Sequence, residues 1–344
     1  MIIACISFFI DLELHQGDFL GNHIFAEYPD KDNLTLPDLC EKLFEAQKKS
    51  WTRLTEACND LASLRTREII CGSYSVQLQY NPHRAVSSGA AVDSETIKNR
   101  PCFLCADNLP DKQQGILYRN SYLILCNPAP IFDHHFTIVA LQHQPQEISP
   151  SLTWLLQMAA DLPPAYTVFY NGPACGASAP DHLHFQMIPV NALPFLHTLS
   201  FLPPSKEISS VRFYKGDDLD RCVVILESKN REALQEQFAH LDKAIRHTVP
   251  INTEPLMNVL CTCENDTWRL VIFLRQKHRP DAYFAADKQR IFVSPGAVDM
   301  AGIMVTPQLI DFNRLDGDTI RGIYQEVSLP AEMMNIINDL NGDL

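Results

Sequence analysis

Residues Tyr170 to Val190 read YNGPACGASAPDHLHFQMIPV, and the centre of this stretch holds two histidines and a glutamine at alternate positions. On a β-strand, residues two apart point to the same face, so His182, His184 and Gln186 would form one row. The apolar residues that alternate with them would point to the opposite face and into a core. A polar row on a strand otherwise suited to burial is costly, which indicates that the row binds something.

The loop before this strand, Asn171 to Ser178, contains two glycines and almost no bulky side chain. Such a loop lets backbone N–H groups approach a phosphate closely. A neutral imidazole beside it can attack a phosphoryl group and form a covalent phosphoramidate. The alternative is a strand whose histidines are simply satisfied by hydrogen bonds.

The same residues resemble the active-site strand of the histidine-triad superfamily, in the branch where glutamine replaces the third histidine. This branch includes galactose-1-phosphate uridylyltransferase, the diadenosine tetraphosphate phosphorylases and the GDP-hexose (GDP-L-galactose) phosphorylases. The string HLHFQ is most similar to the GDP-hexose phosphorylases, and the loop to the diadenosine tetraphosphate phosphorylases. The resemblance implies that His184 is the nucleophile that carries the nucleotide and that Gln186 binds its phosphate. It also places Asn171, Gly176 and Ser178 of the loop at the bound nucleotide.

A second motif, Cys102-Phe103-Leu104-Cys105, has the spacing of half a tetrahedral zinc site. Alone it could equally be redox-active or structural, and the simplest alternative is a reduced pair packed in a turn. The superfamily resemblance adds His143 and His182 as the remaining ligands. Four protein ligands would make the Zn²⁺ structural, and it would fix His182 and, through the strand, the neighbouring nucleophile.

The segments before these motifs supply a helix and a strand. The periodicity from Leu36 to Leu64 predicts one packing helix, and Ser73 to Tyr80 alternates like a strand. The Asn81-Pro82 turn that follows could hold Arg84 toward a phosphate, although most exposed arginines have no such role. Residues 85–100 are small and polar and predict a mobile loop over the site.

The middle of the chain predicts the rest of the catalytic unit. Residues 115–130 and 134–146 are expected to form two strands joined by a proline-containing turn, followed by a helix over 150–162 and a strand over 166–171. By resemblance, Asn127 lies at the ribose. His135 is interpreted as a packing or ribose-side residue.

The C-terminal half repeats this order without the histidine row. It predicts a strand over 222–226, a helix over 230–247 and an antiparallel pair over 257–263 and 268–275. Lys277 and Arg279 belong to a basic cluster, Arg275 to Arg279, that could bind phosphates or could be a solvated turn. The expected fold class is α+β, with two histidine-triad-like units of antiparallel sheet and packing helices, the second degenerate. The expected division is an N-terminal packing segment 1–72, a catalytic unit 73–200 and a second unit 205–344.

Composition and net charge indicate which partners and which cellular compartment to expect. The net charge of −13 argues against a nucleic-acid partner. Met1 to Ile10 is apolar but lacks a basic start and is too short to span a bilayer, so it predicts a buried strand and no membrane partner. Eleven cysteines without secretory context favour free thiols in the cytoplasm. A homodimer is the assembly considered.

The function expected from the resemblance is nucleotidyl transfer. His184 would take a nucleoside monophosphate from a nucleotide-sugar or dinucleoside polyphosphate and pass it to phosphate or a sugar phosphate. Two alternatives remain at this point. Water could discharge the intermediate, which would make a nucleotide hydrolase, or the chain could be a zinc-stapled nucleotide-binding module without turnover.

Overall fold

The structure is a computed structural model of the 344-residue chain. It describes residues 21–90, 93–199, 202–215, 219–249 and 254–335. The strand expected at Met1 to Ile10 lies outside the described residues. None of the helices in these ranges has the length and apolar character needed to cross a membrane.

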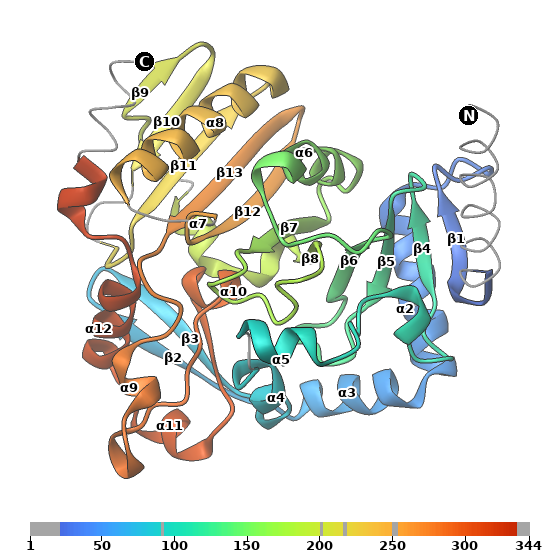
Figure 1. Ribbon diagram of the computed structural model, residues 1–344, viewed down its shortest axis with the longest axis horizontal. Helices are drawn as coiled ribbons and strands as arrows, with labels where there is room; N and C mark the ends of the chain where they lie inside the picture. The colour runs from blue at the N-terminus through green and yellow to red at the C-terminus, as the bar shows by residue number, and fades with distance from the viewer. Residues whose placement is uncertain (1–20, 91–92, 200–201, 216–218, 250–253, 336–344) are drawn as a thin grey trace.

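Most strands belong to one sheet of eleven strands (Figure 1). All neighbours in it are antiparallel except the first pair. In spatial order the strands are β1 (Ile24–Tyr28), β4 (Gly115–Tyr118), β5 (Tyr122–Cys126), β6 (Phe136–Ala140), β8 (His184–Pro189), β7 (Tyr166–Asn171), β12 (Met257–Glu264), β13 (Thr267–Leu274), β11 (Val223–Ser228), β10 (Val211–Lys215) and β9 (Lys206–Ile208).

Apart from β1, this sheet consists of two units with the same order of elements. The first unit runs β4, β5, β6, α6 (Leu152–Asp161), β7 and β8, and the second runs β9, β10, β11, α8 (Arg231–Thr248), β12 and β13. Their spatial orders mirror each other about the contact between β7 and β12, where Asn171 pairs with Asn258. The prediction of two units in an α+β fold is therefore confirmed. The strand β13, which corresponds to β8, carries no histidine, as expected for a degenerate second unit.

One face of the sheet packs on helices α2 (Leu36–Ser50), α3 (Thr52–Ala62), α6 and α8 through a single large apolar cluster. The prediction of one helix over Leu36 to Leu64 was wrong, because Trp51 adopts an extended conformation with φ −120° and ψ 97° and ends α2. Neither glycine nor proline marks this break. The apolar periodicity continues across it because residues of both helices enter the same core.

The other face packs on a second, smaller core. A three-stranded sheet stands over it, made of β2 (Arg65–Cys71), β3 (Tyr74–Tyr80) and β14 (Ile303–Thr306), with β14 parallel to β3. Figure 1 shows β2 and β3 close to α12 at the lower left of the molecule. The helices of the C-terminal region are α7 (Pro194–Leu199), α9 (Asp281–Phe284), α10 (Ala297–Met300), α11 (Leu309–Arg314) and α12 (Gly317–Val327). The short 3₁₀ turns are η1 (Gly21–His23), η2 (Pro82–Arg84), η3 (Ala106–Asn108), η4 (Ser149–Ser151), η5 (Val190–Ala192) and η6 (Asp287–Gln289).

Two local expectations need correction. Residues 115–146 form three strands instead of two, because Arg119 and Asn120 take positive φ values of 47° and 52° and fold β4 onto β5. No glycine announces this turn. The segment 85–100, expected to be a loop, contains the helices α4 (Ala85–Ser88) and α5 (Ser94–Lys98).

The domain boundaries remain predictions. Residue 72 lies in the turn between β2 and β3, and β3 pairs with β14 from the C-terminal region. The units 73–200 and 205–344 therefore share two sheets.

Candidate active site and metal centre

The polar row lies on the face of β8 that is turned away from the larger core. His184 pairs with Val139 of β6 and Gln186 pairs with Thr137. The apolar residues Leu183, Phe185 and Met187 enter the larger core, as predicted. The strand itself begins at His184, so His182 lies just before it and not on it. It is held there because His182 Nε2 contacts the carbonyl of Ala140 at 2.7 Å.

The imidazole of His184 is held in one tautomer. Its Nδ1 lies 2.8 Å from the carbonyl oxygen of His182. Because a carbonyl can only accept, Nδ1 carries the proton and Nε2 keeps its lone pair. Burial lowers the pKa of His184 to about 4, and its side chain is neutral near pH 7. The residue is 5 % exposed, so this lone pair has restricted access to water.

Gln146, in the segment between β6 and α6, fixes the backbone around His184. Its Oε1 accepts from the backbone N–H of His184 at 2.8 Å, and its Nε2 donates to the carbonyls of His184 and Asn171, both at 2.9 Å. One buried side chain thus ties the strand of the candidate nucleophile to the start of the small-residue loop.

Gln186 is oriented by His135. The backbone N–H of Ile131 donates to His135 Nδ1 at 3.2 Å, so the proton of this ring lies on Nε2, which donates to Gln186 Oε1 at 2.9 Å. With its oxygen occupied, Gln186 turns its amide N–H groups away from His135, and among the described residues they meet no protein acceptor. Burial and the nearby Arg84 charge lower the pKa of His135 to about 3, which keeps this ring neutral.

Two further predicted residues lie next to this pair. Arg84 Nη1 donates to the carbonyl of Ala129 at 2.9 Å, and its charge acts on His135. Asn127 donates through Nδ2 to Thr137 Oγ1 at 3.1 Å and accepts the N–H of Ala129 at 2.9 Å. Asn127 therefore shapes the 127–131 segment, and Arg84 is brought to the site.

The small-residue loop packs against a loop from the second half of the chain. Asn171 Oδ1 accepts from Asn258 Nδ2 at 2.9 Å and from the N–H of Ala297 at 2.8 Å. Gly176 has φ +112°, and a Cβ there would lie 2.9 Å from both Asn171 Oδ1 and Gly296 Cα. Only glycine fits this contact without displacement. Ser178 follows in the same loop and is half-buried.

The basic cluster is engaged by the protein. Arg275 is buried and donates to Asn258 Oδ1 at 2.6 Å and to several backbone carbonyls. Lys277 Nζ pairs with Asp281 and Glu326, both at 2.8 Å. Arg279 donates to Ser294 Oγ at 2.9 Å and to the carbonyls of Ser88 and Ala90. None of these contacts involves His184 or Gln186. Arg279 instead holds the segment after Arg84 in place through the carbonyls of Ser88 and Ala90.

The four predicted metal ligands come together. The ligand atoms of Cys102, Cys105, His143 and His182 all lie within 4.8 Å of one another. Cys102 Sγ lies 3.2 Å from His182 Nδ1, and Cys105 Sγ lies 3.2 Å from His143 Nδ1. Ligands of a tetrahedral zinc ion are about 3.5 Å apart, given Zn–S near 2.3 Å and Zn–N near 2.0 Å. The set could therefore hold a metal ion.

The residues around this cluster fit the same interpretation. The Nε2–H of His182 donates to Ala140 O, which directs Nδ1 toward the two cysteines. Asp181 lies 3.9 Å from His143 and is paired with Arg100 at 2.6 Å. The cysteine pair therefore belongs to a cluster that also contains His143 and His182, and is not simply packed in a turn.

Comparisons with known proteins agree with this fold. Residues 43–189 match the model of a domain of unknown function, DUF4922. Yeast Ap4A phosphorylase Apa2 in complex with AMP superposes with a TM-score of 0.56 at 16% identity, over 86% of this chain and 96% of that chain. The same enzyme in complex with Ap4A superposes with a TM-score of 0.51 at 15% identity, over 78% and 90%. At this identity the likeness shows a shared fold. No curated protein matches the chain at the sequence level.

Three residues of the site were not found from the sequence: Gln146, Asn258 and Asp299. Asp299 caps α10 by accepting the N–H of Gly296 at 2.9 Å, and it also accepts the N–H of Val305 in β14 at 2.9 Å. Its charge acts on Arg84. Asp299 lies in α10, close after the loop residue Gly296 that packs against Gly176. Gln146 and Asn258 carry no motif, since only their contacts reveal them.

Proposed function

We propose that the protein is a nucleotidyltransferase of the phosphorylase type that works through a covalent His184–nucleotide intermediate. The observation that carries this proposal is the fixed Nδ1–H tautomer of His184, which presents the Nε2 lone pair beside Gln186. Support also comes from the fold shared with yeast Ap4A phosphorylase, whose structures hold AMP and Ap4A. The substrate would be a dinucleoside polyphosphate or a nucleotide-sugar, and the chain would belong to the glutamine branch of the histidine-triad superfamily.

The reaction proceeds in two displacements. His184 Nε2 attacks the α-phosphorus of the substrate, a P–N bond forms, and the bridging P–O bond breaks so that the polyphosphate or sugar phosphate leaves with the electron pair. An oxygen of inorganic phosphate then attacks the same phosphorus and the P–N bond breaks. The products are a nucleoside diphosphate and the free neutral imidazole.

The surrounding residues position the phosphoryl oxygens. The N–H groups of Gln186 bind a non-bridging oxygen, and Gly176 and Ser178 bind the phosphate from the loop that Asn171 anchors. Arg84 supplies positive charge, and Asn127 shapes the ribose side. For Lys277 and Arg279 the contacts favour an indirect role, because their donors hold the segments that frame the site.

The metal proposed for the cluster of Cys102, Cys105, His143 and His182 is Zn²⁺. Two thiolates and two imidazoles are ligands that zinc prefers, and four of them leave no open position for a catalytic water. When bound, zinc supplies structural rigidity. His182 connects this rigidity to His184, because the carbonyl of His182 fixes the His184 tautomer.

Phosphorolysis is the activity to test. The protein is incubated with Ap4A or a GDP-hexose and with ³²P-labelled inorganic phosphate. We expect the label to appear in the nucleoside diphosphate, and no turnover without phosphate. Turnover that is independent of phosphate and yields an unlabelled nucleoside monophosphate would instead show a hydrolase, and binding without turnover would show a binding module.

A further inference from the structure

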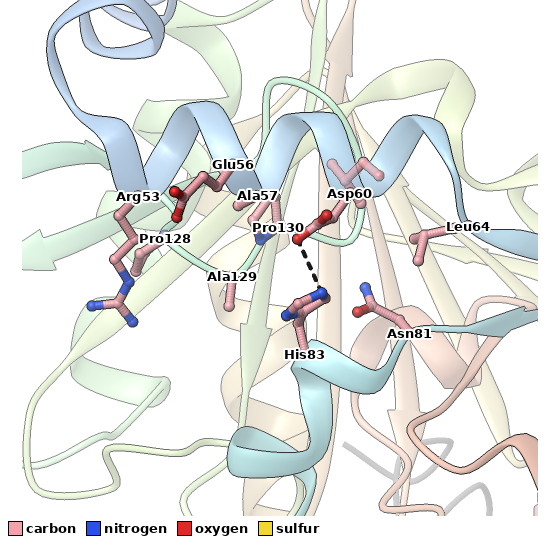
Figure 2. A pocket seen from close by; sticks show the side chains of 11 residues that line it. Arg53, Glu56, Ala57, Asp60, Leu64, Asn81, His83, Pro128, Ala129 and Pro130 are labelled. Atoms are coloured by element: carbon pink, nitrogen blue, oxygen red, sulfur yellow. Dashed lines mark ion pairs between the residues drawn. The ribbon is translucent and has the colours of Figure 1, made fainter.

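A separate cavity of about 220 Å³ lies beside the site, between α3 and the η2 turn (Figure 2). Its third wall is the segment Pro128 to Pro130. Figure 2 shows Glu56 and Asp60 on the α3 wall and His83 on the opposite wall, where His83 Nε2 pairs with Asp60 Oδ2 at 3.0 Å. The site described above uses none of these side chains.

Two walls of this cavity belong to segments that also build the candidate active site. His83 precedes Arg84, whose guanidinium donates to the carbonyl of Ala129, itself a lining residue. The third wall ends next to Ile131, whose N–H fixes His135 and through it Gln186. A nucleotide whose phosphate binds Gln186 would therefore lie next to this cavity, with only the loop that contains Pro128 to Pro130 between them.

The cavity contains a buried polar group without a partner. Asn81 is 2 % exposed, and its Oδ1 makes no hydrogen bond to any residue that the structure describes. In Figure 2 its carboxamide points into the space between η2 and α3. Leaving such a group unpaired costs about 1–3 kcal/mol, which a ligand donor would recover.

The opposite wall carries acceptors. Glu56 and Asp60 are four residues apart on one face of α3, and ionised carboxylates only accept hydrogen bonds. His83 occupies one oxygen of Asp60 and leaves the other. Arg53 at the rim adds donors. A ligand that fits must present neighbouring N–H donors to the carboxylates of α3 and to Asn81 Oδ1, and an acceptor toward the rim.

We propose that this cavity holds the nucleobase of the transferred nucleotide and selects guanine over adenine. This inference rests on the proposed function. The ring N–H and the exocyclic amine of guanine are adjacent donors, and its O6 and N7 are acceptors. Adenine presents an acceptor where guanine has the ring N–H, so it would face the carboxylates with a lone pair. The cavity is smaller than the roughly 300–1,000 Å³ of pockets for drug-sized ligands, which suits a base and not a whole nucleotide.

Equilibrium binding tests the base preference without requiring turnover. Isothermal titration calorimetry is carried out on the full-length wild-type protein with GMP, IMP and AMP. IMP keeps the ring N–H of guanine and lacks the exocyclic amine, so we expect affinity to fall from GMP to IMP to AMP. The total difference should be about tenfold to a hundredfold. Equal affinities, or tighter binding of AMP, would overturn the inference.

Variants of Glu56 and Asp60 test whether the α3 wall causes the preference for guanine. In Asp60→Asn and in the double variant Glu56→Gln/Asp60→Asn, we expect the affinity for GMP to fall at least tenfold and that for AMP to change less than threefold. Glu45→Gln, which removes an exposed carboxylate of α2, should leave both affinities unchanged. Equal losses for GMP and AMP would indicate contact with the ribose and would overturn base selection.

Failure of this inference can be distinguished from failure of the proposed function. Phosphorolysis with an unaltered base preference in the α3 variants would overturn the base pocket alone. Guanine-selective binding without any transfer would overturn the transferase and leave the pocket. Absence of both nucleotide binding and transfer would overturn both.

Discussion

The side-chain amide of Asn258 on β12 donates to Asn171 Oδ1 at the end of β7, at 2.9 Å. These two residues also face each other in the strand pairing that joins the two units of the sheet. Asn171 begins the small-residue loop, so the second unit, which lacks the histidine row of β8, directly supports this loop of the candidate site. The second unit therefore contributes hydrogen bonds that fix the loop in place.

The first prediction concerns the packing of that loop. Gly176→Ala places a Cβ 2.9 Å from Asn171 Oδ1 at a φ of +112°, and we expect the free energy of unfolding to fall by about 2–4 kcal/mol. Denaturant unfolding measures it. The matched control is Gly322→Ala in α12, where the added Cβ would have no atom of the described residues outside its own helix backbone within 4 Å. This substitution should raise the free energy of unfolding by about 0.5–1 kcal/mol. Equal effects of the two substitutions would show that the loop is not tightly packed.

The second prediction concerns the orientation of Gln186. Gln186→Ala should lower kcat about 100-fold, the usual cost of losing one donor to developing charge. His135→Phe should lower it about tenfold, because the Gln186 amide loses the donor that fixes its oxygen. The double variant should be no slower than Gln186→Ala, since His135 acts only through Gln186. Independent, multiplicative losses in this double-mutant cycle would contradict the arrangement.

The third prediction concerns the metal. Elemental analysis should find one zinc per chain, and Cys105→Ser should lose it and lower the melting temperature, because structural zinc contributes directly to folding. Cys222→Ser, outside the cluster, should retain the metal. A chelator should lower thermal stability before it lowers the rate of transfer in molecules that remain folded. Full activity loss without any change in stability would argue for a catalytic ion.

The fourth prediction concerns pH and Glu254. This buried carboxyl accepts from the N–H of Ile148 and from the Tyr170 hydroxyl, both at 2.5 Å. Burial, together with the carboxylates of Glu147 and Asp242, raises its pKa to about 7. Arg246 is the nearby cation. A pKa above the ordinary value of about 4.3 means that stability is fully present at low pH and is lost as the pH rises through about 7.

The expected size of this effect is roughly 2–3 kcal/mol of unfolding free energy lost between pH 5 and pH 8. In Glu254→Gln, which resembles the protonated acid, this part of the pH dependence should disappear. Unfolding by denaturant at four pH values measures both proteins. Parallel profiles would show that Glu254 titrates normally.

Much of the fold could be predicted from short-range patterns. The alternation around His184 identified β8, and the repeat of strand, helix and strand pair identified the second unit, because each pattern reports which face is buried. The break at Trp51 and the turn at Arg119 could not be predicted, because neither contains the glycine or proline that normally signals such a change. β2 was missed because four of its seven residues are polar and its partners β3 and β14 come from distant segments.

The parts of the candidate site that belong to sequence motifs could be predicted. The metal cluster assembled from four residues of three segments, as the resemblance implied. The side chains that position the reacting groups could not be predicted in the same way. Gln146 lies 38 residues from His184 in sequence, and Asn258 lies 87 residues from Asn171. Contacts between residues so far apart in sequence produce no local pattern, because they form only when the strands assemble into one sheet.

The measurement that tests the central claim most directly is intact-protein mass spectrometry after brief mixing with Ap4A or a GDP-hexose in the absence of phosphate. We predict a mass gain of one nucleoside monophosphate in the wild type and in His240→Ala, which removes a half-buried histidine of α8. His184→Gly, shown to be folded by circular dichroism, should gain no mass. A nucleotide adduct that persists in His184→Gly, or that maps to another residue, would contradict the assignment of His184 as the nucleophile.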